Sequence, residues 1–495
     1  MTLVKISPEA TSDPLVLGLA STPKGLHIES ADSQISAVQL KELTLSLTAL
    51  SASAAPDAII KIPHAKLGIL IFTGLGEKQK NYSHETLRRA AGSAARALAG
   101  NKSASFALPH SSTLELSAIA EGAALGAYAF NEFRFSSKQE HKDSLASATI
   151  VSHLSKEPSA KSIAKRAAII ADRTALVRDL INTPPSHLTP ESFSAGMKKV
   201  ATSLGLKVEI LNQSQLKSKG YGGITAVGQG SANPPSLLHI TYAPAKAKKR
   251  YAFVGKGITF DTGGLALKPA AGMEAMKSDM SGAAAVVGAI FAIAELKLPI
   301  AIDAWAPLAE NMPSDSATRP SDIITMYGGK TIEVLNPDVE GRLVLGDALV
   351  RAQEVGKKAG GLDGIIDVAT LTGAQVVALG TRTSAVMTNN ESFSEEFLTA
   401  AHRAGEQFWP MPLPEELRAS LDSPVADMAN IGDRFGGMLV AGLFLKEFIE
   451  PTTPWIHLDI AGPSFNEGAA HGYTPVGGTG IALRSLVVLA ELACA

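Results

Sequence analysis

Short apolar runs alternate with stretches of helix length along most of this chain. After residue 185, helical periodicity or length predicts helices over 190–204, 281–296 and 343–355. Apolar runs between and beyond them predict strands over 207–211, 236–242, 251–254, 300–307, 364–369 and 455–460. Strands separated by helices imply a mostly parallel sheet covered on both faces, with functional residues in the loops at the carboxyl ends of the strands.

The N-terminal third has the same α/β character. A buried strand is expected over 67–72 and helices over 83–98 and 113–130, and Ser83 should cap the first of these helices. We identify no cluster of chemically active residues in this part of the chain.

A long helix predicted over 158–181 ends at Asn182-Thr183-Pro184-Pro185, because proline supplies no amide hydrogen and disfavours helix in the residue before it. We therefore expect two α/β domains: a smaller N-terminal domain over 1–155, a connecting helix over 156–182, and a larger C-terminal domain over 183–495. We interpret the basic face of this helix as a solvated surface rather than a nucleic-acid contact; it carries Lys161, Lys165, Arg166, Arg173 and Arg178.

Composition narrows the possible classes of protein. The 495 residues are 45% hydrophobic and 19% charged, with a net charge of −2, so the chain lacks the basic balance typical of nucleic-acid binding. Cys494 is the single cysteine, which excludes a disulfide framework and a thiolate cluster. The start of the chain does not read as a signal peptide, and no apolar run approaches the roughly 20 residues of a membrane span. We expect a cytoplasmic protein without a membrane partner.

The sequence Asn336-Pro337-Asp338-Val339-Glu340-Gly341-Arg342-Leu343 follows an apolar, strand-like run. In an extended or loop backbone, side chains at alternate positions point the same way, so Asp338, Glu340 and Arg342 can converge. Crowded carboxylates repel and resist desolvation unless a cation lies between them, which favours a bound metal. A solvated acidic turn with a neighbouring salt bridge is the alternative.

A second segment, 254–269, carries Lys256, Asp261 and Lys268 among glycines. Its Gly-x-Gly is not a dinucleotide loop, because the third glycine and a directly following helix are missing. Further on, Asp279 precedes a predicted helix, where it could cap the helix or bind metal.

No compact histidine pair is present, and His457 and His471 are interpreted as structural residues. A metal site would therefore be built mainly from oxygen. Four carboxylates could bridge two divalent ions about 3.5–4 Å apart, namely Asp261, Asp279, Asp338 and Glu340.

These segments together resemble the signature of the leucyl aminopeptidase family, the M17 metallopeptidases or cytosol aminopeptidases. The resemblance extends from Asn182-Thr183-Pro184-Pro185 through 367–373 and 427–432 to 457–462, and it is weak over the first 150 residues apart from 121–128. It implies a C-terminal catalytic domain that hydrolyses N-terminal residues, preferably leucine or other apolar residues, from peptides. It further implies a homohexamer.

The resemblance also assigns roles to residues. It implies that the tighter metal is held by Lys256, Asp261, Asp279 and Glu340, and the more exchangeable one by Asp261, Asp338 and Glu340. Lys268 and Arg342 match the two catalytic positions that are not ligands. The positions that line the substrate pocket are matched by Met276, Thr370, Leu371, Gly373 and Ala461.

The implied chemistry is peptide hydrolysis by a metal-bridged hydroxide, with a bicarbonate at Arg342 as general base. The two metals would be Mn²⁺ or Zn²⁺, with Co²⁺ or Mg²⁺ possible at the exchangeable site. Lys256 can ligate only as the neutral amine, and Lys268, kept cationic, would stabilise the oxyanion. Pro337 and Val339 stand where the family usually has Thr and Ala, and 433–435 replace smaller, less charged residues, so metal affinity and side-chain preference can differ.

Two other functions are compatible with the residues. A two-metal phosphoesterase also uses clustered carboxylates. A DNA-binding or scaffold role could accompany peptidase activity, although the net charge makes nucleic acid an unlikely partner.

Overall fold

The structure is a computed structural model that describes residues 2–10 and 14–494. The chain divides into two compact units: unit 1 comprises Met1–Ala175 and Asn466–Val476, and unit 2 comprises Leu176–Phe465 and Gly477–Ala495. The division falls within helix α4 (Ala160–Asn182). The segment Asn466–Val476, which the sequence pattern did not separate from the C-terminal domain, belongs to unit 1.

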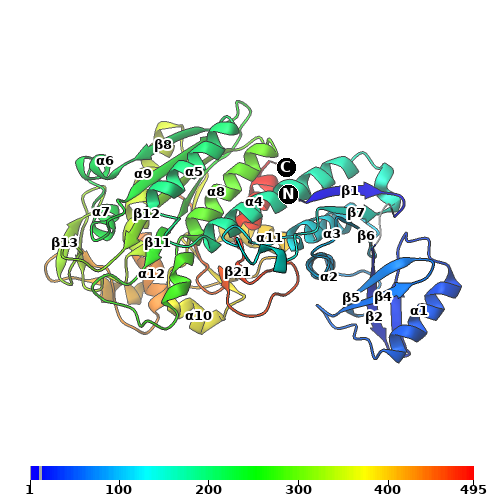
Figure 1. Ribbon diagram of the computed structural model, residues 1–495. Helices are drawn as coiled ribbons and strands as arrows, with labels where there is room; N and C mark the ends of the chain where they lie inside the picture. Colours follow the sequence, from blue (N-terminus) through cyan, green and yellow to red (C-terminus); the bar gives the residue numbers. More distant parts are fainter. Residues whose placement is uncertain (1, 11–13, 495) are drawn as a thin grey trace. The chain divides into compact units, whose positions relative to one another are not determined.

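Unit 1 is an α/β unit built on a seven-stranded sheet in the order β1-β7-β6-β2-β5-β4, with β3 paired to β2 (Figure 1). The pairs β2–β3 and β4–β5 are antiparallel, and the other pairs are parallel. The strands are β1 (Leu3–Ser7), β2 (Leu15–Thr22), β3 (Gly25–Glu29), β4 (Ile59–His64), β5 (Gly68–Glu77), β6 (Ser103–Ala107) and β7 (Ser147–Val151). The helices are α1 (Ala37–Ala49), α2 (His84–Ala97), α3 (Thr113–Gly126), η1 (Lys138–Glu140) and η2 (His153–Lys156).

Local capping chemistry determines where the first helices begin. The Ser83 side chain accepts a hydrogen bond from the Thr86 amide at the start of α2, which confirms the predicted N-cap. Ser112 and Glu115 form a capping box at the start of α3. The interpretation of the basic face as solvated is wrong for Arg178, which is only 1% exposed. Arg166 and Arg173 are partly buried and pair with Glu121 and Asp172.

Unit 2 contains a nine-stranded sheet in the order β17-β16-β19-β15-β10-β12-β9-β8, with β11 paired to β12. The pairs β10–β12, β10–β15, β15–β19, β11–β12 and β16–β17 are parallel, so the sheet is mostly parallel as predicted. Its strands are β8 (Lys207–Leu211), β9 (Ser236–Tyr242), β10 (Arg250–Gly255), β11 (Gly257–Asp261), β12 (Ala301–Asn311), β15 (Gly364–Ala369), β16 (Ser384–Thr388), β17 (Phe408–Pro410) and β19 (Trp455–Asp459).

Helices and smaller sheets surround this central sheet. One small sheet contains β13 (Asp322–Thr325), β14 (Thr331–Val334) and β18 (Met428–Ala429). Another contains β20 (Phe465–Asn466) and β21 (Gly477–Gly478). The helices are α5 (Pro190–Ser203), α6 (Gln213–Ser218), α7 (Gly222–Gly228), η3 (Met273–Ser278), α8 (Ser281–Glu295), α9 (Gly341–Lys358), α10 (Gly373–Leu379), α11 (Glu391–Ala404), η4 (Glu415–Leu421), α12 (Gly437–Lys446) and α13 (Leu483–Ala493).

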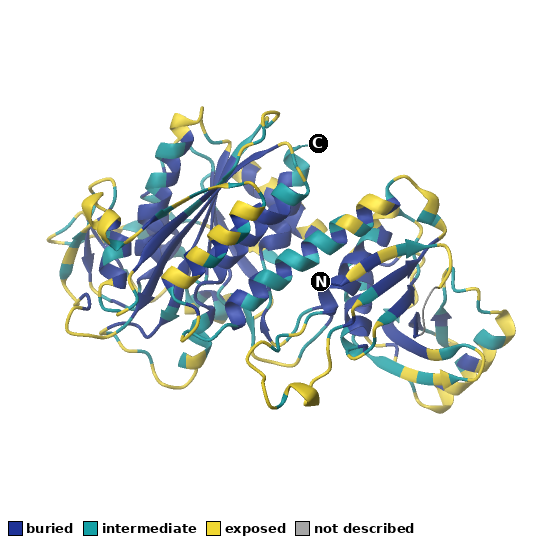
Figure 2. Ribbon diagram, turned by 45° about the horizontal axis from the view of Figure 1, so that its top comes forward, coloured by how far each residue is buried: buried dark blue, intermediate teal, exposed yellow. Residues whose placement is uncertain are grey.

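The core of unit 2 lies between its sheet and the helices that cover it. All residues of β12 are buried, and Figure 2 shows the central strands almost entirely in the buried class. Ala252 and Val254 of β10 pack in one cluster with Leu345 and Ala348 of α9, while α8 also packs on β10. The stretch Met273–Glu295 is long and apolar enough to cross a membrane, but 89% of its most apolar window is buried. That burial is typical of a core helix.

Candidate metal centre and active-site pocket

The predicted ligands of unit 2 come from four segments that the fold brings together. Lys256 lies between β10 and β11, and Asp261 is the last residue of β11. Asp279 lies between η3 and α8, and Glu340 directly precedes α9. The four side chains are nearly inaccessible to solvent, each 5% exposed or less.

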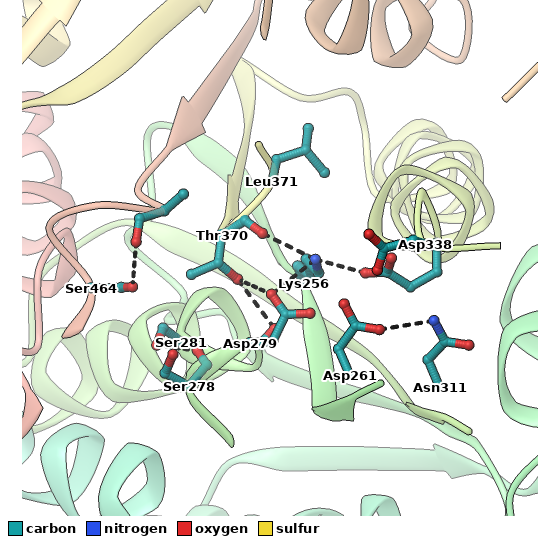
Figure 3. A network of polar contacts seen from close by, with 12 residues as sticks. Lys256, Asp261, Ser278, Asp279, Ser281, Asn311, Asp338, Thr370, Leu371 and Ser464 are labelled. Atoms are coloured by element: carbon teal, nitrogen blue, oxygen red, sulfur yellow. Dashed lines mark hydrogen bonds and ion pairs between the residues drawn. The ribbon is translucent and has the colours of Figure 1, made fainter. Parts of the chain in front are cut away.

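Lys256 is the centre of this group. Its Nζ lies 2.9 Å from Oδ1 of Asp279 and 2.8 Å from Oε1 of Glu340. It also donates a hydrogen bond of 3.0 Å to the carbonyl oxygen of Thr370, which directly follows β15 (Figure 3). The carboxyl ends of β10 and β15 are therefore joined to the start of α9 through one ammonium group.

Lys268 joins the second pair of carboxylates. Its Nζ lies 2.7 Å from Oδ2 of Asp261 and forms a shorter contact with Oδ1 of Asp338. One carboxylate oxygen from each of Asp261, Asp338 and Glu340 lies within 4.8 Å of the other two. The side chain of Lys268 is 21% exposed, against 4% for that of Lys256.

Asp279 does not cap α8. The first residue before that helix is Met280, and α8 has no side-chain N-cap hydrogen bond. The Asp279 carboxylate turns instead toward Lys256 and accepts a 2.7 Å hydrogen bond from the hydroxyl of Thr370 (Figure 3). Helix capping, one of the two interpretations drawn from the sequence, is therefore wrong for Asp279.

The loop that carries Asp338 is held by asparagine side chains. The amide of Asp338 donates to Oδ1 of Asn336, which closes a tight turn. Asn430 Oδ1 accepts hydrogen bonds from the amides of Leu335 and Asn336, and its Nδ2 donates to the carbonyl of Asn336 at 2.7 Å. The backbone carbonyl of Asn430 also accepts a 2.9 Å hydrogen bond from Arg342.

Close approach explains two glycines at the site. A Cβ on Gly341 would lie 2.6–2.7 Å from the end of the Lys256 side chain. Gly263 has φ +85°, and a Cβ there would lie 2.8 Å from Oδ1 of Asp338. Side chains at these positions would displace a lysine and a carboxylate of the cluster.

Burial and mutual charge shift the pKa values of these groups. Burial raises the pKa of Asp279 to about 8, and it raises the pKa of Glu340 above its ordinary value. Burial lowers the pKa of Lys256, but Asp279, Glu340 and Asp261 raise it by more, so the net direction is upward. The surrounding acids therefore favour the ammonium form of Lys256, which could ligate a metal only after losing its proton.

The donor set fits divalent cations. Oδ2 of Asp279 is buried and has no hydrogen-bond partner among residues 2–10 and 14–494. Four acidic side chains contact two lysines here, so positive charge stabilises their ionised forms, and oxygen donors suit Mn²⁺ and Mg²⁺ while Zn²⁺ also accepts them.

A pocket of about 360 Å³ opens beside this cluster, with Asp338, Glu340 and Arg342 in its wall. Of the predicted substrate residues, Leu371 and Gly373 line it. The others do not line this pocket: Thr370 contacts Asp279, Met276 lies in η3, and the amide of Ala461 donates to Asp459. The remaining walls are formed by Val339, Gly341, Thr372, Ala374, Ile431, Gly432, Asp433, Arg434, Gly437 and Val440.

Arg342 is buried in the pocket wall, and burial lowers its pKa to about 10. Its guanidinium carbon lies 5.6 Å from the ring centre of Phe444, and its Nε has no hydrogen-bond partner among the residues that the structure describes. The group therefore remains cationic at neutral pH and retains an unused donor.

Sequence reasoning missed several supporting residues. Nδ2 of Asn311 donates a 2.8 Å hydrogen bond to Oδ1 of Asp261 (Figure 3) and a 3.1 Å hydrogen bond to the carbonyl of Pro337. Asp459 accepts hydrogen bonds from the amide of Leu371 and the hydroxyl of Thr372, which fixes the loop that follows β15. Asn311 gave no signal in the sequence, because the predicted strand ended at residue 307, whereas β12 extends to Asn311.

His457 and His471 are not part of the cluster of acids and lysines. Nδ1 of His457 lies 2.5 Å from Oδ1 of Asp367, and Asp367 also accepts a 2.7 Å hydrogen bond from the indole of Trp455. All three side chains are fully buried in neighbouring strands β15 and β19. His471 lies in the segment of unit 1 and forms a short bridge with Thr474.

Family models match both parts of the chain. The catalytic domain of the cytosol aminopeptidase family matches residues 175–487, and the N-terminal domain of the same family matches residues 29–137. The catalytic-domain match covers every residue of the cluster.

Individual relatives agree with these models. The chain is 47% identical to a probable cytosol aminopeptidase of Streptomyces coelicolor, with 99% of this chain and 97% of that protein aligned. It is 48% identical to a probable cytosol aminopeptidase of Streptomyces avermitilis, with 100% and 99% aligned. Among solved structures, the bottromycin maturation enzyme BotP in complex with Mn has a TM-score of 0.84 and 36% identity, covering 97% of this chain and 99% of that one.

Proposed function

The chain belongs to the cytosol aminopeptidase family, and we propose that it is a two-metal-dependent leucyl aminopeptidase. In this proposal it removes N-terminal leucine and other apolar residues from peptides. The observation that carries the proposal is the position of Lys256 Nζ, within 2.9 Å of both Asp279 and Glu340. A lysine buried among acids can balance their charge as ammonium and, once neutral, can contribute a nitrogen ligand.

The ligand assignment follows from the two halves of the cluster. We assign the tighter metal to Lys256, Asp261, Asp279 and Glu340, and the exchangeable metal to Asp261, Asp338 and Glu340. The greater exposure of Asp338, 31% at its side chain against 7% for Asp279, supports faster exchange at the second site. We propose Mn²⁺ or Zn²⁺ at both sites, with Co²⁺ or Mg²⁺ possible at the exchangeable one; the similar enzyme BotP was solved with Mn.

The reaction requires charge stabilisation at the scissile peptide bond. When bound, two divalent cations supply an activated water nucleophile at neutral pH and polarise a carbonyl group. Lys268 contacts Asp261 and Asp338, and the acids around it raise its pKa despite burial, which supports a cationic role. In this proposal its ammonium group donates to the oxyanion of the tetrahedral intermediate.

Arg342 has a separate role in this proposal. Its guanidinium lines the pocket next to Glu340 and would hold a bicarbonate ion, which when bound supplies a general base. The hydrogen bond from Arg342 to the carbonyl of Asn430 fixes the direction of the guanidinium. No protein carboxylate then has to leave the metal cluster to accept a proton.

The pocket lining supports a preference for apolar residues. Val339, Leu371, Ile431 and Val440 contribute aliphatic surface, and burying such surface against a leucine side chain is favourable by roughly 1.5–3 kcal/mol. Asp433 and Arg434 add charge at one side of the pocket, so part of the substrate would meet a polar wall. By family membership we also propose a homohexamer in the cytoplasm with peptides as its partners.

A chelation experiment tests the proposal. We expect a strong chelator to abolish hydrolysis of a leucyl amide and added Mn²⁺ or Zn²⁺ to restore it. Hydrolysis that survives complete removal of metal would contradict the proposal. Phosphate esters assayed in parallel should not be cleaved, and their cleavage without amide hydrolysis would support a phosphoesterase. Salt-sensitive binding to duplex DNA that survives Asp338→Ala and Glu340→Ala would support a DNA-binding role.

A further inference from the structure

Three metal-ligating side chains meet at one edge of the sheet of unit 1. His110 follows β6 and His153 follows β7, and these two strands are parallel neighbours. Parallel strands place their carboxyl ends at the same edge, where ligand sites commonly form in α/β sheets. Asp32, which follows β3, joins them, and one ligand atom from each of the three residues lies within 4.8 Å of the others.

Asp32 and His153 are already in contact. Nδ1 of His153 lies 3.0 Å from Oδ2 of Asp32, and the backbone amide of His153 donates a 2.7 Å hydrogen bond to the same oxygen. The imidazole rings of His110 and His153 are stacked, with centroids 5.3 Å apart and planes inclined by 13°. The carboxylate and both rings are therefore positioned by backbone and ring contacts before any ligand binds.

Hydrogen bonds select the tautomer of His110. The carbonyl oxygen of Leu108 lies 2.9 Å from Nδ1, and because a carbonyl can only accept, Nδ1 carries the proton. Nε2 therefore presents a lone pair, which accepts a 2.7 Å hydrogen bond from the hydroxyl of Ser152. An imidazole that donates one nitrogen to a backbone carbonyl and presents the other as a lone pair has the arrangement of a metal-binding histidine.

We propose that Asp32, His110 and His153 form a metal site in unit 1, separate from the cluster of unit 2, that binds Zn²⁺. Two imidazoles and one carboxylate are donors that suit zinc, whereas Mg²⁺ and Ca²⁺ require oxygen donors. Three protein ligands leave a fourth position for water, and the His153 side chain is 51% exposed, so that position can face solvent. A zinc ion here would replace the Ser152 hydroxyl at Nε2 of His110.

The site would connect two loops and a short helix of unit 1. Asp32 and His110 lie in the loops that follow β3 and β6, His153 is the first residue of η2, and a shared ion would hold these segments against one another. Binding energy of this kind adds to the free energy of unfolding, because the unfolded chain has no preformed site. Zinc would thus stabilise unit 1, and none of its three ligands lines the pocket of unit 2.

Metal stoichiometry of the full-length protein tests the proposal. After chelation and dialysis, the protein is titrated with Zn²⁺ and bound metal is measured by equilibrium dialysis with elemental analysis. We expect the wild type to bind one equivalent more than the His110→Ala/His153→Ala double variant. His141→Ala, which removes an exposed imidazole of the same unit, should bind as much as the wild type. Because the readout is a difference in equivalents, it is independent of whether the cluster of unit 2 is catalytic.

A second variant and a spectroscopic measurement show whether a loss of Zn²⁺ binding comes from lost ligands or from misfolding. Asp32→Asn keeps an acceptor for the His153 amide but removes the charged ligand, so it should weaken binding at this site by at least tenfold while circular dichroism stays unchanged. Cu²⁺ used as a probe should show hyperfine coupling to two imidazole nitrogens in the wild type that is lost in the double variant. Equal Zn²⁺ stoichiometry in the wild type and the double variant would overturn the proposal and leave Asp32 and His153 as an ordinary hydrogen-bonded pair.

Discussion

The ε-nitrogen of Lys256 lies 2.8 Å from Oε1 of Glu340, and a Cβ on the neighbouring Gly341 would collide with that lysine. The residue after β10 and the residue before α9 thus meet with no room for another side chain. Because the pair is buried, any change that leaves Glu340 without a cation must force a proton onto it or destabilise the unit.

Lys268→Ala should lower the turnover of a leucyl amide by roughly 10²–10³-fold, because removing one donor to an oxyanion typically costs that much. The metal content should stay that of the wild type, since Lys268 is not assigned as a ligand. Lys246→Ala, which removes an exposed lysine of the same unit, provides the control and should be fully active. Loss of metal from Lys268→Ala would show that this residue is misassigned.

Gly341→Ala tests whether the close contact with Lys256 outweighs the higher helix propensity of alanine. Alanine is favoured over glycine by roughly 1 kcal/mol in a helix, yet its Cβ would lie 2.6–2.7 Å from the Lys256 side chain. We expect displaced Lys256, weaker metal binding and activity reduced by about 10²-fold.

The matched change is Gly196→Ala in α5, where a Cβ would meet nothing within 4 Å. It should raise the free energy of unfolding by about 0.5–1 kcal/mol with unchanged kinetics. Full activity in both variants would contradict the close-packing account of Gly341.

Asn430→Ala should weaken metal binding by about 10–100-fold although Asn430 is not assigned as a ligand, because it holds the loop that carries Asp338. Asn389→Ala removes a comparable asparagine that donates to the carbonyl of Thr453 and accepts from the amide of Trp455. Both variants should lose stability by about 1–3 kcal/mol, but metal affinity, followed by calorimetric titration, should fall only in the first. Equal metal affinities in the two variants would argue against the supporting role of Asn430.

The pH dependence of stability should carry a signature of Asp347, a fully buried residue of α9. Burial raises its pKa from 3.8 to about 7, and hydrogen bonds from the amides of Tyr327 and Ile224 only partly oppose this shift. Suppose that a carboxyl group has a higher pKa in the folded protein than in the unfolded chain. Its contribution to stability is complete at a pH below the unfolded-state pKa, and it is lost as the pH rises to the folded-state pKa.

The wild type should therefore lose stability relative to Asp347→Asn between about pH 4 and pH 7, and the difference should level off above pH 7. Urea unfolding of both proteins at pH 5, 6, 7 and 8, with metal absent throughout, measures it. A difference that does not change with pH would mean that Asp347 ionises normally inside the fold.

Local sequence signals predicted elements whose ends are set by local chemistry. Ser83 caps α2 and Pro190 begins α5 as expected, because cap and first-turn preferences act over a few residues. Strands β16 and β17 were not predicted, since short strands lack a clear hydrophobic period. The basic face of α4 was misread at Arg178, because a stripe of arginines does not reveal which of them the rest of the unit covers.

For the site, sequence reasoning located the acids and lysines but not the groups that hold them. Asp261 and Asp338 stand out because charge is uncommon beside buried strands, whereas Asn311 and Asn430 are ordinary polar residues until the fold brings them to those loops. The pair Asp32 and His153 gave no signal for the same reason: their separation of 121 residues is closed only by the sheet of unit 1.

The most direct test of the central claim is a crystal structure of the Mn²⁺-loaded protein with anomalous differences measured at the manganese edge. We expect two peaks about 3.5–4 Å apart in unit 2. The first should be bound by Lys256, Asp261, Asp279 and Glu340, and the second by Asp261, Asp338 and Glu340. A single peak, or Lys256 still paired only with carboxylates in active, metal-loaded protein, would contradict it.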